Sequence, residues 1–453
     1  MRGEQKKQIV QQIDVALLRA IESARDANKL FELAEHYGKF HWLNTTERWA
    51  CPEVENHIFR LIEPRLPALR ASQNRTMVSH VISEGYDVGG HTPLCINLMK
   101  EHKKRGTGVQ FVITRGVTKK VLMEVQNTQI PILAQNSTGV AKLLFLTEVF
   151  LKSKSVVLYI NPDDIIACLA AKIAEREGVQ CHFVNHADLH FSYGPSQCST
   201  VLEITWASWL TTQKYRSPKG QSFLGIPSGD FSPTEIKDAA SANNLPPYFI
   251  SVGGPHKYQL DQTDVFLKFV EFLCGKMQQK LLLVGPSNQQ AFSKLSTTAK
   301  SNLELCGIVD RDKTLILMAG AKAYLDSFPE GGGTSVTNAM KLGMPVFGAK
   351  SKVGMFGDEY ASDSLEDLYC AIENFLLNGP DPEKIRTRAT FIDEQLSLSA
   401  CLDRLANTID GNHEAIPFSF DIDKIDLTYY QRAWLEQDRL YIPPIIKNRP
   451  PTN

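Results

Sequence analysis

Hydrophobic and polar residues alternate with two different periods along the chain. From about Lys6 to Phe40, and again from about Val54 to Leu69, apolar residues recur at helical spacing. This spacing predicts helices. After Arg75 the pattern changes to short apolar runs, rich in β-branched and aromatic residues, that are separated by longer amphipathic stretches. Such alternation is typical of a parallel sheet with helices on both faces.

The predicted strands form two series. The first comprises TMVSHVIS, VQFVIT, IPILAQ, SVVLYI, CHFVNH and LEITWA, and the second comprises YFISVGG, KLLLVGP, LELCGIV, AYLDSF and MPVFGA. Between them, the stretch from Gly225 to Pro247 is polar and rich in turn-forming residues, which indicates a domain boundary. We therefore expect a helical segment over 1–72, an α/β domain over 73–240, a second α/β domain over 241–412 and a C-terminal helical segment over 413–453.

Composition agrees with two domains and narrows the class of protein. The 453 residues exceed what one hydrophobic core usually organises. A net charge of -1 at pH 7 provides no global basic field that would hold nucleic acid. The first residues carry charges throughout and no stretch reaches membrane-spanning length, so we expect a soluble cytoplasmic protein. The nine cysteines lack paired spacing, which argues against a disulfide framework and a structural zinc site.

The first candidate for chemistry follows the first predicted strand. Two successive α/β domains predict a cleft between them, and ligands of such sheets bind beyond the carboxyl ends of the strands. A strand ending near Ser83 leads through Gly89 and Gly90 into a helix near Thr92, with His91 beside it. Exposed N–H groups at a helix start favour an anion. A tight turn capped by Thr92 explains the same glycines equally well.

The second candidate is a cluster of histidines. The strand CHFVNH ends with Asn185 and His186, and Asp188 follows. A histidine at a cleft can exchange a proton or bind a charged substrate group. A metal site is the weaker interpretation, because strand alternation puts these side chains on different faces. For His182 and His190 we favour a structural role.

The second predicted domain offers two loops. The strand YFISVGG leads through Gly254 to Lys257, and a lysine after a glycine turn supplies a point charge for phosphate, although a solvated lysine is the plain alternative. The stretch SFPEGGGTSVTN places Glu330 before three glycines that open a helix, where amides and the helix dipole can hold a diphosphate. The Glu330 carboxylate would instead accept hydrogen bonds from sugar hydroxyls. The alternative is an acidic residue favoured by the dipole alone.

Together these motifs resemble the GT-B glycosyltransferases, in particular the retaining group 1 family with the signature PSxxEGFGLxxxEAMAxGxPVV. The stretch DSFPEGGGTSVTNAMKLGMPVF is similar to that signature over its whole length. GYDVGGHT, FVNHAD, FLGIPSGDF and SVGGPHKY are similar to further family landmarks in the same order. The resemblance implies two Rossmann-like, doubly wound domains facing across a cleft. It also implies a last helix, within YYQRAWLEQDRL, that crosses back to the first domain.

The resemblance also implies roles for particular residues. Lys257 and the amides around Gly332 to Ser335 would hold the donor diphosphate, Glu330 would bind the donor sugar, and His186 with Gly90 would face the transferred sugar. The family's second glutamate, which binds the nucleotide ribose, falls on Asn338. Our candidates are therefore, for catalysis, His91, His186 and Glu330 and, for the nucleotide sugar, Gly89, Gly90, Gly254, Lys257, Gly331, Gly332, Gly333, Thr334, Ser335 and Asn338.

The implied activity is a retaining hexosyl- or N-acetylhexosaminyltransferase of glycan biosynthesis. It would take a UDP-sugar as donor, would need no metal or further cofactor, and would transfer to a glycan, lipid-linked or protein acceptor. Peripheral membrane association stays open. The motif DRD over 310–312 matches a metal-binding pattern, but helix capping by Asp312 explains it better.

Three alternatives remain at this point. One is an inverting GT-B transferase with His91 or His186 as base, and another is a sugar-nucleotide epimerase. The third is a non-catalytic nucleotide-sugar-binding subunit, for which Asn338 is the suggestive feature.

Overall fold

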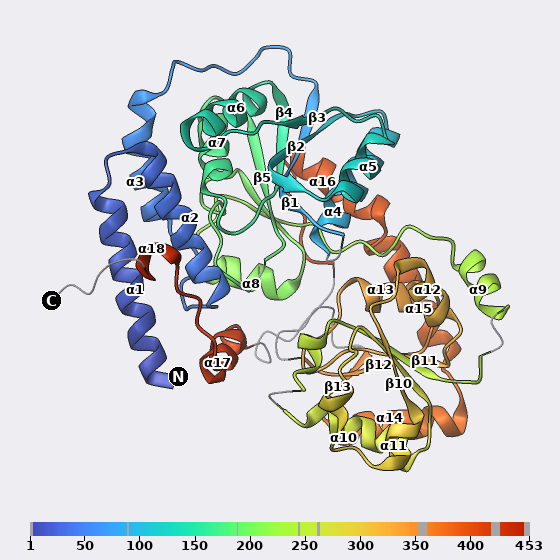
Figure 1. The fold of residues 1–453 in the computed structure, drawn as a ribbon. Coiled ribbons are helices and arrows are strands. Elements are labelled where there is room, and N and C mark those ends of the chain that lie inside the picture. Colours follow the sequence, from blue (N-terminus) through green and yellow to red (C-terminus); the bar gives the residue numbers. More distant parts are fainter. Residues whose placement is uncertain are drawn as a thin grey trace. The chain divides into compact units, whose positions relative to one another are not determined.

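The computed structural model describes residues 3–87, 90–187, 189–242, 245–260, 263–351, 360–417 and 426–447 (Figure 1). The chain divides into two compact units. Unit 1 comprises Met1–Gly225, Leu402–Ala415 and Leu427–Asn453, and unit 2 comprises Ile226–Cys401 and Ile416–Asp426.

Unit 1 combines a helical layer with a parallel sheet. Its helices are α1 (Gly3–Ser23), α2 (Ala27–Leu43), α3 (Pro52–Ile62), α4 (His91–Lys104), α5 (Lys119–Gln126), α6 (Gly139–Leu151), α7 (Ile165–Arg176), α8 (Trp206–Tyr215), α17 (Tyr429–Glu436) and α18 (Pro444–Lys447). Its strands are β1 (Met77–Gly85), β2 (Gly108–Val117), β3 (Ile132–Ala134), β4 (Ser153–Tyr159), β5 (Gln180–Asn185), β6 (Thr200–Glu203) and β7 (Gln221–Phe223). Helix α16 (Leu398–Ile409) spans the division between the units.

Unit 2 is a smaller α/β body. Its helices are α9 (Pro233–Ser241), α10 (Val265–Val270), α11 (Thr297–Asn302), α12 (Arg311–Ala319), α13 (Thr334–Lys341), α14 (Leu365–Asn378) and α15 (Pro382–Gln395). Its strands are β8 (Phe249–Val252), β9 (Leu281–Val284), β10 (Leu303–Gly307), β11 (Ala323–Leu325), β12 (Val346–Ala349) and β13 (Ala361–Ser362). Helix α9, from the turn-rich stretch, packs against α12 and so belongs to this unit.

The N-terminal helices have the period that their sequence predicted. Asp26 interrupts the first run and caps α2, where its side chain accepts a hydrogen bond from the Lys29 N–H at 2.8 Å. Pro52 opens α3, a position that costs no intrahelical hydrogen bond. Helices α2 and α3 pack on α6 and α7 (Figure 1). Their apolar residues belong to one continuous core that extends from α1–α3 into the sheet.

Both sheets are parallel and doubly wound, as predicted. The strand order of unit 1 is β3-β2-β1-β4-β5-β6-β7, and that of unit 2 is β10-β9-β8-β11-β12-β13. The sequence pattern predicted all of these strands except β7 and β13, which are too short for a recognisable apolar run. Strand order reverses between β1 and β4 and again between β8 and β11. At such switch points the loops diverge, which leaves room for a ligand.

The C-terminal segment from Leu427 onward belongs to unit 1. The Lys6 side chain is fully buried, and its Nζ donates to the carbonyl oxygens of Trp434 at 2.6 Å and Gln437 at 3.0 Å. The same ammonium lies 3.6 Å from the centre of the Trp434 ring. Because a lysine cation stabilises carbonyls at a helix C-terminus, this contact ties α17 to α1.

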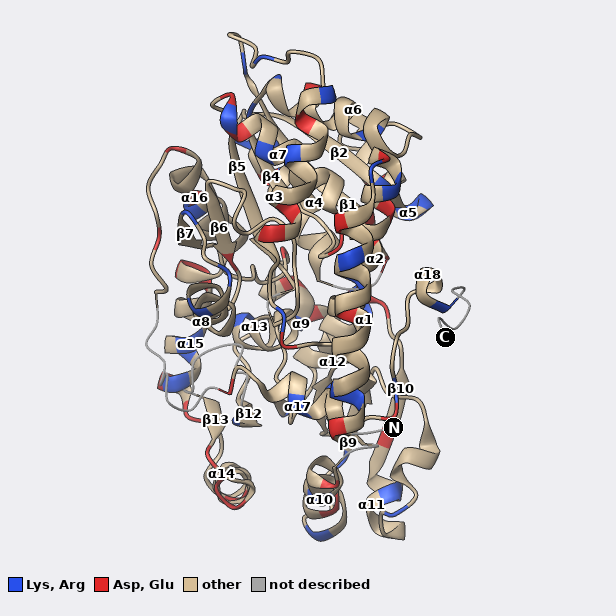
Figure 2. Ribbon diagram, turned by 90° about the vertical axis from the view of Figure 1, so that its left-hand side faces the viewer, with Lys and Arg blue, Asp and Glu red and all other residues tan. Residues whose placement is uncertain are grey.

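Charged residues of both signs are spread over the helices of both units (Figure 2). The charged residues of helix α14 are all acidic. Within the described part of the chain, no helix is long and apolar enough to cross a membrane.

Candidate functional site

Two loops meet at the switch point of the second sheet. One follows β8 and carries Lys257 in a 3-10 helix over Pro255–Tyr258, and the other joins β11 to α13 and carries the glycine run. The buried Tyr258 anchors the first loop, because its hydroxyl shares a 2.9 Å hydrogen bond with the Ser251 hydroxyl. The structure thus brings together two motifs that are more than 70 residues apart.

Backbone and side-chain contacts join these loops directly. The Lys257 Nζ donates to the Gly331 carbonyl at 3.0 Å, and the Glu330 N–H donates to the Lys257 carbonyl at 3.2 Å. Gly254 precedes them and its carbonyl accepts from the Lys257 N–H at 3.0 Å. A lysine has three donors, so this contact leaves the Lys257 ammonium able to bind an anion as well.

The glycine run leads into the first turn of α13. Gly333 stands at the N-cap without a side chain to cap the helix, and Thr334 and Ser335 are its first residues. The first N–H groups of a helix have no acceptor within it and carry the positive end of the dipole. The Gly332 N–H is used differently, because it donates to the Asp326 Oδ1 at 2.8 Å. An anion would therefore be met by the amides that follow Gly332.

Glu330 is partly exposed beside this turn. Its Oε1 accepts a hydrogen bond from the Gln259 Nε2 at 2.8 Å. Gln259 is 6% exposed and has φ 44°, so it follows the 3-10 helix in a left-handed conformation. This residue holds the carboxylate, and no sequence motif pointed to it.

Asn338, expected near a ribose, has a contact within unit 2. Its Oδ1 accepts from the Gly229 N–H at 2.7 Å, and Lys341 donates to the Gly229 carbonyl at 2.8 Å. The side chain is 8% exposed. Asn338 therefore holds the segment around Gly229 that enters unit 2. A contact of its amide nitrogen with a ribose stays a prediction.

In unit 1 the two candidate histidines lie against each other. Their rings stack with centres 4.9 Å apart and planes 20° apart. The His91 Nε2 lies 2.8 Å from the Glu84 carbonyl oxygen, and the His186 Nε2 lies 2.9 Å from the Ile160 carbonyl oxygen. Since a carbonyl can only accept, Nε2 carries the proton in both rings and Nδ1 holds the lone pair.

Burial keeps both imidazoles neutral. It lowers the pKa of His186 to about 3, and the neighbouring His91 adds to that effect. Burial also lowers the pKa of His91, against the opposing influence of Glu84. The pair is therefore suited to accept hydrogen bonds at Nδ1 near neutral pH rather than to carry charge.

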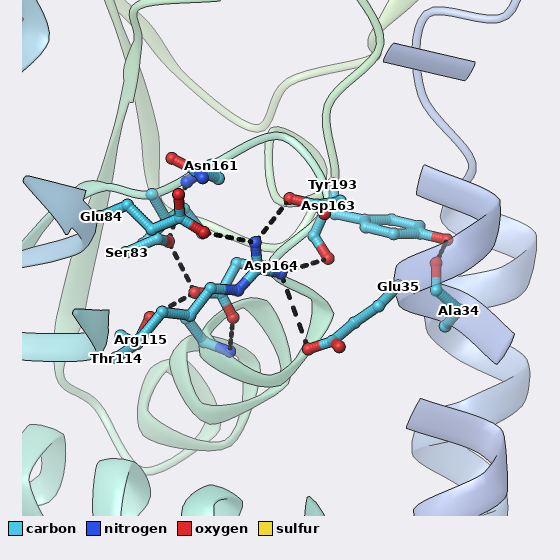
Figure 3. A network of polar contacts seen from close by, with 12 residues as sticks. Ala34, Glu35, Ser83, Glu84, Thr114, Arg115, Asn161, Asp163, Asp164 and Tyr193 are labelled. Carbon is cyan, nitrogen blue, oxygen red and sulfur yellow. Dashed lines mark hydrogen bonds and ion pairs between the residues drawn. The ribbon is translucent and has the colours of Figure 1, made fainter. Parts of the chain in front are cut away.

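A polar network that sequence reasoning missed lies at the switch point of the first sheet (Figure 3). Arg115, near the end of β2, donates to the Asp163 Oδ1 at 2.9 Å. The same guanidinium lies 3.6 Å from carboxylate oxygens of Glu84 and of Glu35 on α2. The sequence feature that could have indicated this network is NPDD, in which two aspartates follow closely after the apolar run SVVLYI.

Asp164 completes this network and caps α7. Its Oδ1 accepts from the Ala167 N–H at 3.2 Å, and its Oδ2 accepts from the hydroxyls of Ser83, at 2.6 Å, and Thr114. Burial opposes ionisation here, but Arg115 and these hydrogen bonds together hold the pKa of Asp164 below its usual value. Burial raises the pKa of Asp163 and that of Glu35, in spite of Arg115.

Two predicted helix caps differ from those in the structure. Helix α4 begins at His91 with Gly90 at its N-cap, so the prediction of Thr92 as the cap was wrong; the Thr92 hydroxyl instead accepts from the Tyr86 N–H at 3.0 Å. Asp310, not Asp312, caps α12, with its side chain accepting from the Lys313 N–H at 2.9 Å.

Two of the candidate residues, Gly89 and Asp188, lie outside the described residues. Among the described residues, no cluster of three His, Cys, Asp or Glu side chains could hold a metal ion.

Comparison with known proteins identifies the fold. No protein-family model and no curated protein sequence matches the chain. A glycosyltransferase from Rickettsia africae ESF-5 superposes with a TM-score of 0.57, at 13% identity over 75% of this chain and 100% of its own. Anabaena Alr3699/HepE, solved with UDP and glucose, gives 0.55 at 14% identity over 74% of this chain and 100% of its own. An O-GlcNAc transferase mutant from Thermobaculum terrenum gives 0.53 at 12% identity over 94% of this chain and 81% of its own.

The chain has the GT-B fold. The predicted class of two Rossmann-like domains is thereby confirmed, whereas membership of the retaining group 1 family stays a prediction. A putative UDP-N-acetylglucosamine 2-epimerase from Listeria monocytogenes also superposes on the chain, with a TM-score of 0.50 at 10% identity over 76% of this chain and 100% of its own.

Proposed function

We propose that this GT-B protein is a glycosyltransferase that takes a nucleoside diphosphate sugar as its donor. Unit 2 would bind the donor, and unit 1 would bind the acceptor, a glycan, lipid-linked molecule or protein. The observation that carries the proposal is the direct contact between Lys257 and the glycine run at the start of α13. A cation and a helix N-terminus together fit a diphosphate.

The chemistry follows from where charge develops. As the bond between the sugar and the diphosphate breaks, the leaving diphosphate gains negative charge. The Lys257 ammonium and the amides of Gly333, Thr334 and Ser335 would stabilise that charge without reorganising. Glu330, held by Gln259, would accept hydrogen bonds from sugar hydroxyls. These groups belong to the chain itself, so we propose that transfer needs no metal.

The other candidate residues would act on the transferred sugar. The Nδ1 atoms of His91 and His186 can accept hydrogen bonds from sugar hydroxyls. We propose retention of the anomeric configuration, as the signature resemblance implies. An inverting reaction would need one of these rings as a base, a role for which their lowered pKa values make them poor. Analysis of the anomeric configuration of the product by NMR separates the two outcomes.

A thermal-shift screen tests donor binding first. We expect one of UDP, GDP, ADP, TDP and CMP to raise the melting temperature of the protein equally with and without a chelator. At about 100 times its dissociation constant a ligand stabilises the fold by about 2.7 kcal/mol. We favour UDP, because HepE of the same fold was solved with UDP and glucose. If no nucleotide shifts the transition, the proposed donor site is wrong.

Two variants then test the site itself. Lys257→Ala should weaken nucleotide binding and slow transfer, since one lost donor at such a site costs about 100- to 1000-fold in rate. Lys341→Ala is the matched control, because Lys341 also donates to a backbone carbonyl of unit 2 but lies at the other end of α13. Equal effects of the two variants would argue against a phosphate contact by Lys257.

An epimerase is the second candidate, because the Listeria monocytogenes protein of the same fold is a putative UDP-N-acetylglucosamine 2-epimerase. An epimerase converts its nucleotide sugar in the absence of any acceptor. Incubation with UDP-N-acetylglucosamine alone, followed by chromatography of the nucleotide sugars, therefore decides between the two. An epimer formed without an acceptor would replace our proposal. A non-catalytic subunit would bind nucleotide and show neither reaction.

A further inference from the structure

A buried carboxylate closes the loop between β11 and α13. Asp326 follows the last residue of β11 and is 3% exposed. Its Oδ1 accepts from the backbone N–H groups of Ser327 at 2.9 Å and Gly332 at 2.8 Å, and its Oδ2 accepts from the Tyr360 hydroxyl at 2.9 Å. One side chain thus joins the first residue of the loop, its glycine run and the segment that enters β13.

The packing at Gly332 shows how closely the loop fits this carboxylate. A Cβ atom added at Gly332 would lie 2.5 Å from the Asp326 Oδ1 and 2.8 Å from the Ser335 hydroxyl oxygen. Both separations are shorter than real Cβ atoms tolerate. Glycine is therefore required here for close approach to Asp326. The requirement is separate from any contact with a ligand.

Groups of opposite charge hold one peptide unit of the loop at its two ends. The Asp326 carboxylate holds the N–H of Gly332, while the Lys257 ammonium holds the carbonyl of Gly331. These two groups belong to the same peptide unit, so its orientation is determined from both sides. The N–H groups that follow, from Gly333 to Ser335, start α13 and lack acceptors within the helix.

We propose that Asp326 is a positioning residue for the donor site. Its carboxylate sets the orientation of the glycine loop, so that the N–H groups at the start of α13 and the Lys257 ammonium can bind the diphosphate of a nucleotide sugar together. The inference rests on the function proposed above. Asp326 itself does not contact the diphosphate, because two anions repel and its oxygens are already engaged by three donors. Its contribution is to hold the donors in place before the ligand arrives.

The competing explanation is that Asp326 only stabilises unit 2. Asp326→Ala and Asp326→Asn separate the two. Asparagine keeps an oxygen for both backbone N–H groups, and its amide can donate to the Tyr360 oxygen, whereas alanine loses all three contacts. Tyr360→Phe removes one contact only. Tyr248→Phe is the matched destabilising control, because Tyr248 is also buried in unit 2 and its hydroxyl donates to the Leu317 carbonyl at 2.6 Å.

The experiment titrates UDP and GDP into the full chain and its variants by calorimetry, well below the melting temperature of each. We expect Asp326→Ala to weaken nucleotide binding at least 10-fold, Tyr360→Phe to weaken it 2- to 5-fold, and Asp326→Asn to stay within about 3-fold of the parent chain. Tyr248→Phe should bind as the parent does. If Asp326→Ala does not fold, Tyr360→Phe and Asp326→Asn measured against Tyr248→Phe decide the question.

Two results would overturn the positioning role while leaving the proposed function intact. One is that every Asp326 and Tyr360 variant that folds binds nucleotide as tightly as the parent chain. The other is that Tyr248→Phe loses as much affinity as these variants, which would make the effect one of general destabilisation. A different result, in which the parent chain binds neither UDP nor GDP, would refute the donor site itself and the positioning role with it.

Discussion

A buried histidine should make the stability of unit 1 depend on pH. His182 lies on β5 and is 1% exposed, and neither of its ring nitrogens has a hydrogen-bond partner among the described residues. Burial lowers its pKa from 6.5 to about 4, and the nearby His413 adds to this effect. Below pH 6.5 the unfolded chain therefore takes up a proton that the folded chain does not. A group with a depressed folded pKa stabilises the protein above pH 6.5 and loses that contribution as the pH falls toward 4.

The size of the effect follows from the two pKa values. At pH 5, which is about 1.5 units below the unfolded pKa of 6.5, the histidine is protonated in the unfolded chain but still mostly neutral in the folded chain. At 1.36 kcal/mol for each unit, this costs the folded state about 2 kcal/mol. Replacing His182 with leucine removes the titrating group and two polar atoms without partners. The variant should thus equal or exceed the parent in stability at pH 7, and its advantage should grow by about 2 kcal/mol at pH 5.

Urea unfolding followed by tryptophan fluorescence measures this difference. All five tryptophans, Trp42, Trp49, Trp206, Trp209 and Trp434, lie in unit 1, so the signal reports the unit that contains His182. His256→Leu serves as the control, because His256 is exposed and lies in unit 2. The reasoning is refuted if the free-energy difference between the His182→Leu variant and the parent is the same at pH 7 and pH 5.

Three further predictions concern contacts within one or the other unit. Arg115→Met leaves two buried carboxylates without their cation and should lower the free energy of unfolding of unit 1 by about 3 to 5 kcal/mol, measured with urea; an unchanged midpoint would contradict the network. Gly285→Ala should destabilise unit 2 in calorimetry by at least about 2 kcal/mol more than Gly379→Ala, because Gly285 has φ +117° and its added Cβ would lie 1.9 Å from a carbonyl oxygen, whereas Gly379 has open space; equal losses would be inconsistent with this contact. Lys6→Met should speed proteolysis of the C-terminal segment several-fold relative to Lys7→Met, whose lysine is exposed; similar rates would show that Lys6 does not hold that segment.

Much of the fold could be predicted because local pattern and tertiary role agree along most of the chain. The apolar runs that form β1, β4, β8 and β9 are buried on both faces, as strands of a parallel sheet with helices on each side must be. The short strands β7 and β13 were missed because three residues, or two, show no period. Helix starts at His91 and Arg311 were misplaced by one residue or more, since several neighbouring residues could have served as caps.

The candidate site was predictable to a lesser degree, and for a definite reason. Lys257, Glu330 and the glycine run stood out because glycines and charges after a strand are unusual in sequence. Gln259 and Asp326 did not stand out, because a glutamine and an aspartate have no recognisable spacing. Their roles depend on contacts that only the folded chain creates: Gln259 on the Glu330 carboxylate, and Asp326 on the Gly332 amide.

The sequence by itself determined the helical and strand periods, the two-domain class and the glycine-rich, charged character of the loops after β8 and β11. These properties are local, since they depend on residue types at short spacing. Tertiary structure alone decided which loops meet. The reversal of strand order between β8 and β11 brings Lys257 against Gly331, and the reversal between β1 and β4 gathers Arg115 with Asp163. Strand order is settled by the packing of apolar faces over long distances in sequence, and no short stretch of residues encodes it.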